Sequence, residues 1–224
     1  MKTSINFKVV KSDSEIHNFR KKSFDYIRKD LTHKNEYWME QKIADRLLKI
    51  EAFCKEKSGR KLQKNAMPVR EAVVVIKENT TMQDLHNLSK RLEEELKIRI
   101  FQIAIHKDEG HYDKDTKEWK PNYHAHLVAD WQDLETGKTL KHQSFHYSKM
   151  QDLAAECLEM ERGISGSLAR LEAVEFKIKK KEEDLKILEE RYNEIKTELE
   201  SKKSEDLIVK ESDFLGFQKI KTDK

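Results

Sequence analysis

The stretch IAIHKDEGHYDKDTKEWKPNYHAHLVAD, residues 103–130, decides the fold. Apolar residues alternate up to His106, and a second alternating run carries His124 and His126 two residues apart. Side chains at i and i+2 of a strand point to one face, so the two runs predict a hairpin with three imidazoles on the same side. Beside Glu109, three histidines in this arrangement indicate a divalent-metal site. The alternative is a set of exposed strand histidines without a ligand.

Apolar periodicity predicts the elements around this hairpin. Period-two patterns and β-branched runs indicate strands, and apolar residues at spacings of three and four indicate helices. The Asn79-Thr80-Thr81 stretch is typical of a helix N-terminus. We expect strands over residues 5–10, 72–76, 98–106 and 122–131, and helices over residues 36–56, 82–97 and 147–162.

The order of these elements indicates an α+β fold built on an antiparallel sheet. Helices are expected on one face of the sheet, which leaves the other face free. The three histidines would lie on the free face, where a ligand can reach them. The residues expected under the helices are Ile103, Ile105, Tyr123, Ala125 and Leu127.

Composition excludes few classes of function. Charged residues make up 39% of the 224-residue chain and hydrophobic residues 37%, a balance typical of long solvated helices. The net charge of +3 favours no class of partner, so local patches must decide. Cys54 and Cys157 lack C-x-x-C spacing and are expected to be reduced thiols. No apolar run reaches the length of a membrane span or a signal peptide, so we expect a soluble, cytoplasmic protein.

The chain changes character after Gly163. Apolar residues recur every seven positions from Ile164 to Leu199, with companions three residues later, among many Lys and Glu residues. This pattern predicts a coiled coil. We expect one domain over residues 1–163, a coiled-coil helix over residues 164–203 and a charged tail over residues 204–224. The coiled coil would join two copies of the chain or bind an accessory protein; the alternative is a single solvated helix.

The N-terminal segment supplies further candidate site residues. His17, Asn18 and Arg20 belong to the sequence HNFR, in which an imidazole and a guanidinium lie on one side of a helical turn. An Arg binds phosphate through two N–H groups, and His or Tyr can attack phosphorus as a nucleophile. Tyr26 and Tyr37 follow in the sequence and are the other candidate nucleophiles.

These motifs, in this order, resemble those of the MobV class of plasmid mobilisation relaxases, also called Mob/Pre enzymes. HNFR at residues 17–20 matches the first family motif, and LTHKNEY at residues 31–37 approximates the second, with Glu36 inserted before the tyrosine. HKDE at residues 106–109 and HAH at residues 124–126 match the two halves of the third. The resemblance covers roughly residues 5–163.

The long connection between the two halves of the third motif departs from the family pattern. It reads GHYDKDTKEWKPNY, and it separates Pro121 from the first histidine of the pair. A hairpin extension with a turn at residues 113–117 accommodates it, because strands can lengthen without moving their base. In this respect the chain is similar to Bacteroides-type mobilisation proteins.

The resemblance implies an HUH-endonuclease fold. It also implies the nicking and rejoining of one DNA strand at an origin of transfer, through a covalent 5′-phospho-protein intermediate, for plasmid or transposon mobilisation. His106, His124 and His126 would hold a divalent ion that polarises the scissile phosphate. We expect Mn²⁺ or Mg²⁺, with Zn²⁺, Ni²⁺ or Co²⁺ as alternatives, because imidazole suits several of these metals.

The resemblance also gives roles to the N-terminal residues. His17 corresponds to the proposed nucleophile of the family, and Tyr26 or Tyr37 is the alternative because most other relaxases use tyrosine. Arg20 would bind a phosphate and Asn18 would position the strand. Glu109 would orient a ligand histidine, bind the ion through water or act as a base.

A basic segment offers separate support for DNA binding. We expect it to neutralise phosphates beside the site, and the alternative is a solvated loop. Tyr112, Trp119 and Tyr123 in and near the insertion could stack on unpaired bases. The basic residues that we single out are Lys57, Arg60, Lys61, Lys64 and Arg70.

Three other functions stay open on the sequence. They are a related HUH replication initiator or transposase, a non-catalytic DNA-binding coiled-coil accessory protein, and a metal-dependent hydrolase of small molecules. HNFR ahead of the histidine pair argues against the first, because those enzymes generally place the nucleophile after the pair. A DNA-nicking assay distinguishes the other two from a relaxase.

Overall fold

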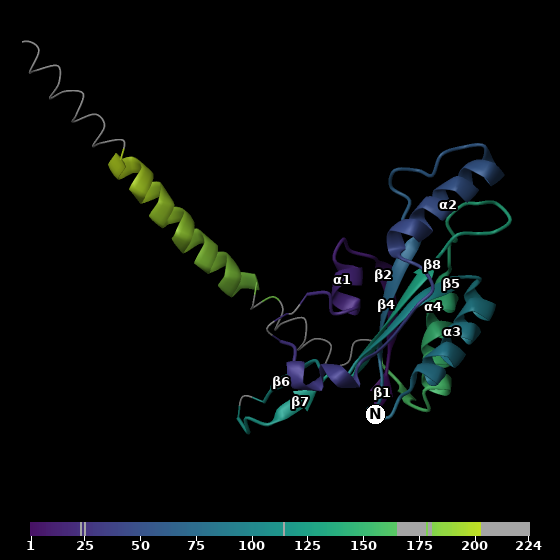
Figure 1. Cartoon of the computed structure of the whole chain (residues 1–224), viewed down its shortest axis with the longest axis horizontal. Helices are drawn as coiled ribbons and strands as arrows, with labels where there is room; N and C mark the ends of the chain where they lie inside the picture. Colours follow the sequence, from purple (N-terminus) through teal and green to yellow (C-terminus); the bar gives the residue numbers. More distant parts are fainter. Residues whose placement is uncertain (23, 25, 114, 165–177, 179–180, 203–224) are drawn as a thin grey trace, which may run out of the picture. The chain divides into compact units, whose positions relative to one another are not determined.

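The chain forms two units in the computed structural model (Figure 1). Residues Met1–Gly163 make the first unit and Ile164–Lys224 the second. The structure describes the whole chain apart from residues 23, 25, 114, 165–177, 179–180 and 203–224. The predicted charged tail and much of the predicted coiled coil therefore lie outside the described residues.

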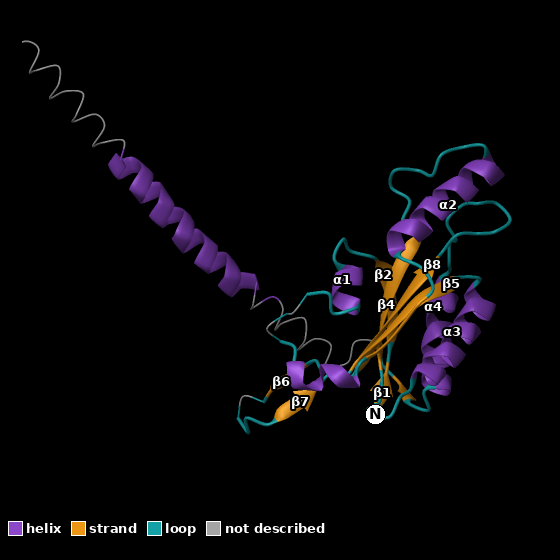
Figure 2. Ribbon diagram, in the orientation of Figure 1, coloured by secondary structure: helices purple, strands orange, loops and turns teal. Residues whose placement is uncertain are grey.

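A five-stranded antiparallel sheet forms the centre of the first unit (Figure 2). Its strand order is β2-β4-β8-β5-β3, so β8 is central and the predicted pair of strands are neighbours. The predicted antiparallel α+β fold is thereby confirmed. The strands are β2 (Ile5–Val9), β3 (Glu36–Met39), β4 (Val69–Val75), β5 (Arg99–His106) and β8 (His124–Asp130).

Helices α3 (Met82–Leu96) and α4 (Ser144–Cys157) cover one face of this sheet, as predicted (Figure 2). The Thr81 side chain accepts a hydrogen bond from the backbone of Asp84 and so caps α3. Capping of this kind stabilises a helix by about 1 kcal/mol. The predicted N-terminus of this helix is thus confirmed.

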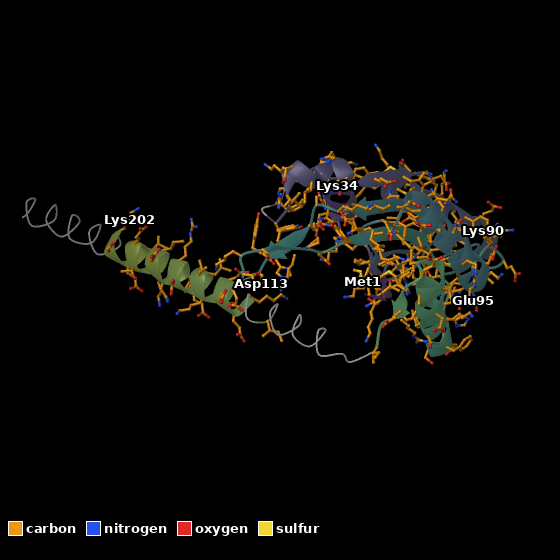
Figure 3. All side chains as sticks on the ribbon, turned by 90° about the horizontal axis from the view of Figure 1, so that it is seen from below. Met1, Lys34, Lys90, Glu95, Asp113 and Lys202 are labelled. Atoms are coloured by element: carbon orange, nitrogen blue, oxygen red, sulfur yellow. The ribbon has the colours of Figure 1, made fainter. Side chains whose placement is uncertain are left out.

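The main core lies between α3, α4 and the sheet. Leucines recur along α3 at spacings of three and four, which places them on the face toward the sheet, whereas Lys90 and Glu95 point outward (Figure 3). Tyr123 is partly buried against the same core. The predicted set under the helices is therefore in place. Of that set, the fully buried members are Ile103, Ile105, Ala125 and Leu127, and they pack with Leu85, Leu88, Leu92 and Leu96 of α3.

The second face of the sheet is not free. Helix α2 (Ile43–Ser58) packs there through a small apolar cluster that joins Ile50 with Phe101 and Val128. The short helix α1 (Ser14–Asn18) also lies on this face, since its Ser14 side chain donates a 2.5 Å hydrogen bond to Glu71 on β4. The expectation of an uncovered second face is wrong, because α1 and α2 both bury part of it.

The helix predicted over residues 36–56 is two elements. Residues Glu36–Met39 form the edge strand β3, which pairs with residues 102–105 of β5, and α2 begins only at Ile43. Trp38 packs against the main core from this strand, and its ring lies 4.9 Å from that of His86 on α3. The helical spacing holds from Ile43 onward, whereas Trp38 lies five residues earlier and belongs to the sheet.

The last predicted helix of the first unit is also shorter than expected. Helix α4 ends at Cys157, and Glu159 follows with a positive φ of 49°, which breaks the helical path. Residues Glu161–Arg162 then form β9, which pairs in parallel with β1 (Lys2–Thr3). The end of the first unit thus returns to its N-terminus.

The insertion in the third motif forms a hairpin of its own, as predicted. Strands β6 (Gly110–Tyr112) and β7 (Trp119–Pro121) pair as an antiparallel ribbon, with Asp113 at the turn (Figure 3). The Asp113 carboxylate accepts backbone N–H groups of Asp115 and Thr116, which closes the turn. The 3-10 helix η1 (Lys29–Lys34) completes the elements of the first unit within the described residues.

The second unit contains a helix over residues 181–202. Its apolar side chains are exposed, with Leu185 57% and Tyr192 67% accessible. None of the helices among the described residues combines the length and apolar character needed to cross a membrane.

Candidate metal centre and its surroundings

Strand register brings the three predicted histidines together. His106 of β5 pairs directly with His124 of β8, and His126 pairs with Ala104 on β5 and Val73 on β4. The three imidazole centroids lie 4.8, 5.0 and 5.1 Å apart. Ala104 has only a methyl side chain, which leaves the space between the strands to the rings.

The histidines are buried, in contrast to the expected open position. His106 is 0% exposed, His124 4% and His126 6%. Helix α1 lies over them, since the ring of His17 sits 5.2 Å from His106 and 5.1 Å from His126. A fourth histidine therefore joins the triad, and the four rings offer ligand atoms that all lie within 4.8 Å of one another.

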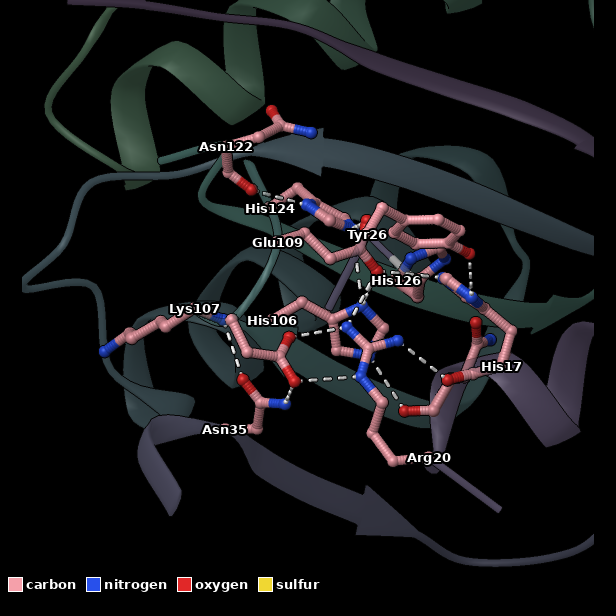
Figure 4. A network of polar contacts seen from close by, with 12 residues as sticks. His17, Arg20, Tyr26, Asn35, His106, Lys107, Glu109, Asn122, His124 and His126 are labelled. Carbon is pink, nitrogen blue, oxygen red and sulfur yellow. Dashed lines mark hydrogen bonds and ion pairs between the residues drawn. The ribbon is translucent and has the colours of Figure 1, made fainter. Parts of the chain in front are cut away.

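Each triad histidine has one ring nitrogen that faces away from the other two rings, called here its outer nitrogen. This nitrogen lies beside an oxygen that can only accept a hydrogen bond. Nε2 of His106 lies 2.9 Å from the carbonyl of Asn18, and Nδ1 of His124 lies 2.8 Å from the carbonyl of Asn122 (Figure 4). Nδ1 of His126 lies 2.6 Å from a carboxylate oxygen of Glu71. Each outer nitrogen must therefore carry the proton, which fixes the tautomer of all three rings.

The inner nitrogens are then lone pairs that point at one another. Nδ1 of His106 and Nε2 of His124 are 3.3 Å apart, and neither has a proton to share while both rings are neutral. Burial lowers the pKa of His106 and lowers that of His124 to about 4, so the neutral forms prevail at pH 7. Converging lone pairs repel each other, and a cation between them relieves that repulsion.

His126 provides the clearest sign that the site takes a ligand. Its Nε2 atom is buried and has no hydrogen-bond partner among the described residues, although its Nδ1 is firmly held by Glu71. A buried polar atom of this kind is costly unless something outside the chain satisfies it. With one nitrogen from each of three imidazoles, the residues present fit a divalent ion with open positions.

Glu109 follows the C-terminal end of β5 and faces the triad. Its carboxylate oxygens lie 3.5 Å from Nδ1 of His106 and 3.8 Å from Nε2 of His124. Burial alone would raise the pKa of Glu109, but the neighbouring His106, His124 and Arg20 side chains lower the pKa to about 2. A negative charge thus sits beside the nitrogen ligands, where it adds to their attraction for a cation.

His17 differs from the triad in its setting. It comes from α1 rather than from the sheet, and its side chain is 20% exposed. Its Nε2 lies 3.4 Å from Glu109, and its Nδ1 lies 3.3 Å from the hydroxyl of Tyr26 (Figure 4). Burial lowers the pKa of His17 to about 4, which keeps the ring neutral and nucleophilic at pH 7.

The two candidate tyrosines both lie near the cluster, with rings 6.4 Å from His17 for Tyr26 and 6.5 Å from His106 for Tyr37, but their hydroxyls have different partners. Tyr26 is 48% exposed and touches His17 through its hydroxyl. Tyr37 is 40% exposed, and its hydroxyl accepts a 3.1 Å hydrogen bond from Asn35 instead. Burial raises the pKa of both tyrosines, which disfavours the phenolate that a tyrosine nucleophile needs.

Arg20 is occupied within the protein. Its guanidinium donates to both carboxylate oxygens of Asp108, at 2.6 and 3.1 Å, and to Glu109 at 2.7 Å. It also donates to the carbonyl of His17 at 3.0 Å, and its side chain is only 8% exposed. These N–H groups hold His17 and Glu109 in place, and the expected contact of Arg20 with a phosphate stays a prediction.

Asp108, which binds Arg20, also binds two residues of the second sequence motif. It is 0% exposed and also accepts hydrogen bonds from Thr32 at 3.1 Å and Asn35 at 2.7 Å. These bonds tie η1 and the second sequence motif to the end of β5. The motif residues therefore form a hydrogen-bonded frame that holds the segments around the histidines in place. Asn18 belongs to the same frame, since its side chain donates to Glu71 at 2.8 Å.

The basic segment lies at the other end of the sheet. Residue Val69, which follows it, pairs with Asp130, six positions along β8 from His124. At about 3.3 Å per residue, that separation is roughly 20 Å. The expectation that the segment lies beside the site is wrong, and its contact with DNA stays a prediction for Lys57, Arg60, Lys61, Lys64 and Arg70.

Two residues of that set already have aromatic partners. The guanidinium of Arg70 lies 4.2 Å from the centre of the Trp131 ring, and Nζ of Lys57 lies 5.5 Å from that of Phe53. Near the site, the hairpin carries Tyr112, which is 57% exposed. Its ring meets Trp119 edge-on at 5.1 Å, so the aromatic pair also stabilises the hairpin.

Sequence reasoning missed Glu71 and did not use Asp108. The signal for Glu71 was a single acidic residue in a mostly apolar strand, VREAVVV, on the same face as Val69 and Val73. The signal for Asp108 was its position two residues after His106, on the same side of the chain. Both residues lie in direct contact with the motifs that sequence analysis identified.

Comparison with solved structures identifies the fold. The chain is similar to the MobM relaxase domain (MOBV; Mob_Pre) bound to a 22-nucleotide oriT DNA of plasmid pMV158, in a Mn-bound crystal structure at pH 5.5. That match has a TM-score of 0.55 at 16% sequence identity, and it covers 75% of this chain and 93% of the other.

Two further structures of the same domain agree. The Mn-bound complex with 3′-thiophosphate oriT DNA at pH 6.8 matches with a TM-score of 0.55 at 15% identity, covering 75% and 93% of the two chains. The complex at pH 4.6 matches with a TM-score of 0.54 at 15% identity, covering 75% and 94%.

Neither a protein-family model nor a curated protein matches the sequence. The comparisons therefore establish architecture, and at 15–16% identity they establish nothing finer. The expectation of a relaxase-like sheet is confirmed at that level: Met1–Gly163 contains the fold of the MobM relaxase domain.

Proposed function

We propose that this protein is a metal-dependent DNA relaxase of the MobV type, which nicks and rejoins one strand of DNA at an origin of transfer. The observation that carries the proposal is the set of inner imidazole nitrogens. They converge in a buried site without protons, and Nε2 of His126 lacks a partner among the described residues. The fold supports it, because solved structures that this chain resembles are relaxase domains bound to oriT DNA.

His106, His124 and His126 are the metal ligands in this proposal, with Glu109 beside them. The solved relaxase domains are Mn-bound, which favours Mn²⁺ or the similar Mg²⁺ over softer metals. A divalent ion bound there supplies Lewis-acid polarisation of the scissile phosphate. Glu71 keeps the ring of His126 oriented and raises its basicity through the 2.6 Å hydrogen bond.

His17 is the nucleophile in this proposal. It is neutral at pH 7, more exposed than the triad, and fixed beside it by Arg20 through its carbonyl. A lone pair of the ring attacks phosphorus and forms a P–N bond. The P–O3′ bond breaks, its electron pair stays on the 3′ oxygen, and that oxygen takes up a proton from water.

The charge balance of that step is met within the site. The His17 ring becomes positively charged as the P–N bond forms, and the Glu109 carboxylate lies 3.4 Å from its Nε2. The covalent bond retains the energy of the phosphodiester. The reverse attack by a 3′ hydroxyl therefore rejoins the strand without a further energy source.

Single-stranded DNA is the substrate in this proposal, and action on plasmid or transposon DNA places the protein in the cytoplasm. Exposed Tyr112 and the basic set around Lys61 and Arg60 are the candidate contacts for bases and phosphates. The two surfaces lie at opposite ends of β8, so a strand that touched both would run along the sheet.

The experiment uses a library of random-sequence single-stranded DNA, because the cognate origin is not needed to detect the chemistry. The full chain is incubated with the labelled library and Mn²⁺, and protein that carries DNA is recovered under denaturing conditions. The proposal expects a covalent adduct that is enriched for one sequence, requires the metal, and disappears on adding a chelator.

Variants assign the adduct to the site. His126→Ala should abolish it, whereas His33→Ala should not, because His33 is exposed and lies outside the cluster. A folded His126→Ala protein that forms the adduct at the normal rate would contradict the metal assignment. Specific binding of DNA without an adduct would favour the non-catalytic accessory protein instead.

A further inference from the structure

The helix over residues 181–202 carries an apolar stripe of exposed side chains. Five apolar residues follow one another at spacings of three, four, three and four, which keeps them on one side of the helix. A short isolated helix is only marginally stable in water, so its stripe is expected to pack on another helix. The stripe residues are 50–67% exposed and are Leu185, Leu188, Tyr192, Ile195 and Leu199.

The stripe defines a heptad register for this helix. The stripe residues alternate between the a and d positions of the heptad, and the residues on either side of the stripe occupy the e and g positions. Charges at e and g decide the partner and its direction, because they face each other across the seam. The a positions are Leu185, Tyr192 and Leu199; the d positions are Leu188 and Ile195; the flanking charges are Glu189 and Lys196 at e, and Asp184, Arg191 and Glu198 at g.

A parallel pair of identical helices is disfavoured by these charges. In that arrangement each g residue faces the e residue five positions later in the other copy. Asp184 then faces Glu189, and Arg191 faces Lys196. Both contacts join like charges, and symmetry repeats each of them on the other side of the seam.

An antiparallel pair brings opposite charges together instead. Reversing one helix sets e opposite e and g opposite g. With Leu188 opposite Leu199 of the second copy, Glu189 faces Lys196 and Arg191 faces Glu198. All four of these contacts, counting the symmetric copies, join opposite charges.

The charges also select one register of the antiparallel pair. A shift by one heptad in one direction sets Glu189 opposite itself and Arg191 opposite itself. A shift in the other direction sets Lys196 and Glu198 opposite themselves. Each shift replaces attraction with repulsion at the centre of the seam, so the unshifted register is favoured.

We propose that two copies of this chain associate through residues 185–202 as an antiparallel coiled coil, with Leu188 of one copy packed against Leu199 of the other. The two chains then enter the coiled coil from opposite ends. This proposal rests on the helix alone and does not depend on the nicking activity.

Lys196→Glu in the full chain separates the two directions. The introduced carboxylate lies opposite Glu189 in the antiparallel pair but opposite Arg191 in a parallel pair. The dimer dissociation constant, measured by sedimentation, should rise about tenfold or more, because two equivalent contacts change sign. Glu189→Lys combined with Lys196→Glu should restore it. Lys186→Glu makes the same charge change on the outward face and should leave it unchanged.

Cross-linking tests the register directly. Leu188→Cys and Leu199→Cys are made separately in a full chain that also carries Cys54→Ala and Cys157→Ala. A mixture of the two proteins should give covalent dimers with a short bismaleimide, and each protein alone should give few. A monomer at all concentrations, tighter association of Lys196→Glu, or efficient cross-linking of Leu188→Cys alone would overturn the proposal.

Discussion

Glu71 gives a sharp test of the metal centre, because it touches a proposed ligand without being one. Its carboxylate accepts the His126 Nδ1–H at 2.6 Å and the Asn18 amide at 2.8 Å, in a side chain that is only 14% exposed. Burial alone would raise the pKa of Glu71, but the hydrogen bond from His126 and the others lower it to about 2, so the group is charged. Glu71→Gln keeps the shape and removes the charge.

The expected effect is a loss of metal affinity. A carboxylate behind a ligand histidine typically contributes about 10- to 100-fold in metal affinity, through orientation and basicity of the ring. Glu71→Gln should therefore raise the Mn²⁺ dissociation constant by that factor, or about 1.4–2.7 kcal/mol. Isothermal titration calorimetry of the full chain measures it without DNA.

Asp130→Asn is the matched control. Asp130 is a 2% exposed carboxylate on β8, the strand that carries His126, and it pairs with Arg99 at 2.8 Å, far from the triad. It should lower thermal stability without changing the dissociation constant. Equal affinity of wild type and folded Glu71→Gln would refute the reasoning, and so would an equal loss in Asp130→Asn, because the effect would then be general.

Three further outcomes are expected. Mn²⁺ at 100 times its dissociation constant should raise the melting temperature of the full chain by about 5–11 °C, since such binding contributes ~2.7 kcal/mol, and the chelated protein should show no rise. Asp108→Asn should destabilise the folded state by about 3 kcal/mol in chemical denaturation, because it removes a fully buried partner of Arg20; a change under 1 kcal/mol contradicts the framing role. Gly110→Ala should open the hairpin and shift Trp119 fluorescence to longer wavelength, because an added Cβ would lie 2.4 Å from the Lys120 carbonyl oxygen; an unchanged spectrum contradicts this.

The central hairpin was predictable because its signal is local. Alternation sets which residues share a face, and a one-residue slip would move every histidine to the opposite face. His106 opposite His124 follows from that rule once the two strands pair. The core leucines of α3 and its cap at Thr81 were predictable for the same reason.

Contacts between distant strands were not predictable in this way. Glu71 lies 55 residues from His126, and nothing in the alternation of either strand says that β4 and β8 are neighbours. The basic segment was misplaced for the same reason, because strand order determines the end of the sheet at which a loop lies. Non-local pairing is set by the whole fold.

One other error has a local cause. Strand β3 has four residues, too few for alternation to outweigh the helical spacing of Ile43, Leu47 and Ile50, which follow it.

The most direct test of the account is the identity of the amino acid that becomes linked to DNA. The adduct formed with Mn²⁺ is trimmed with nuclease and protease, and the modified peptide is sequenced by mass spectrometry. The account predicts a phosphoramidate on His17, which is lost in mild acid and is stable in alkali, and an adduct that persists in Tyr26→Phe and Tyr37→Phe. An acid-stable phosphodiester on Tyr26 or Tyr37, with adduct formation retained in His17→Ala, would contradict it.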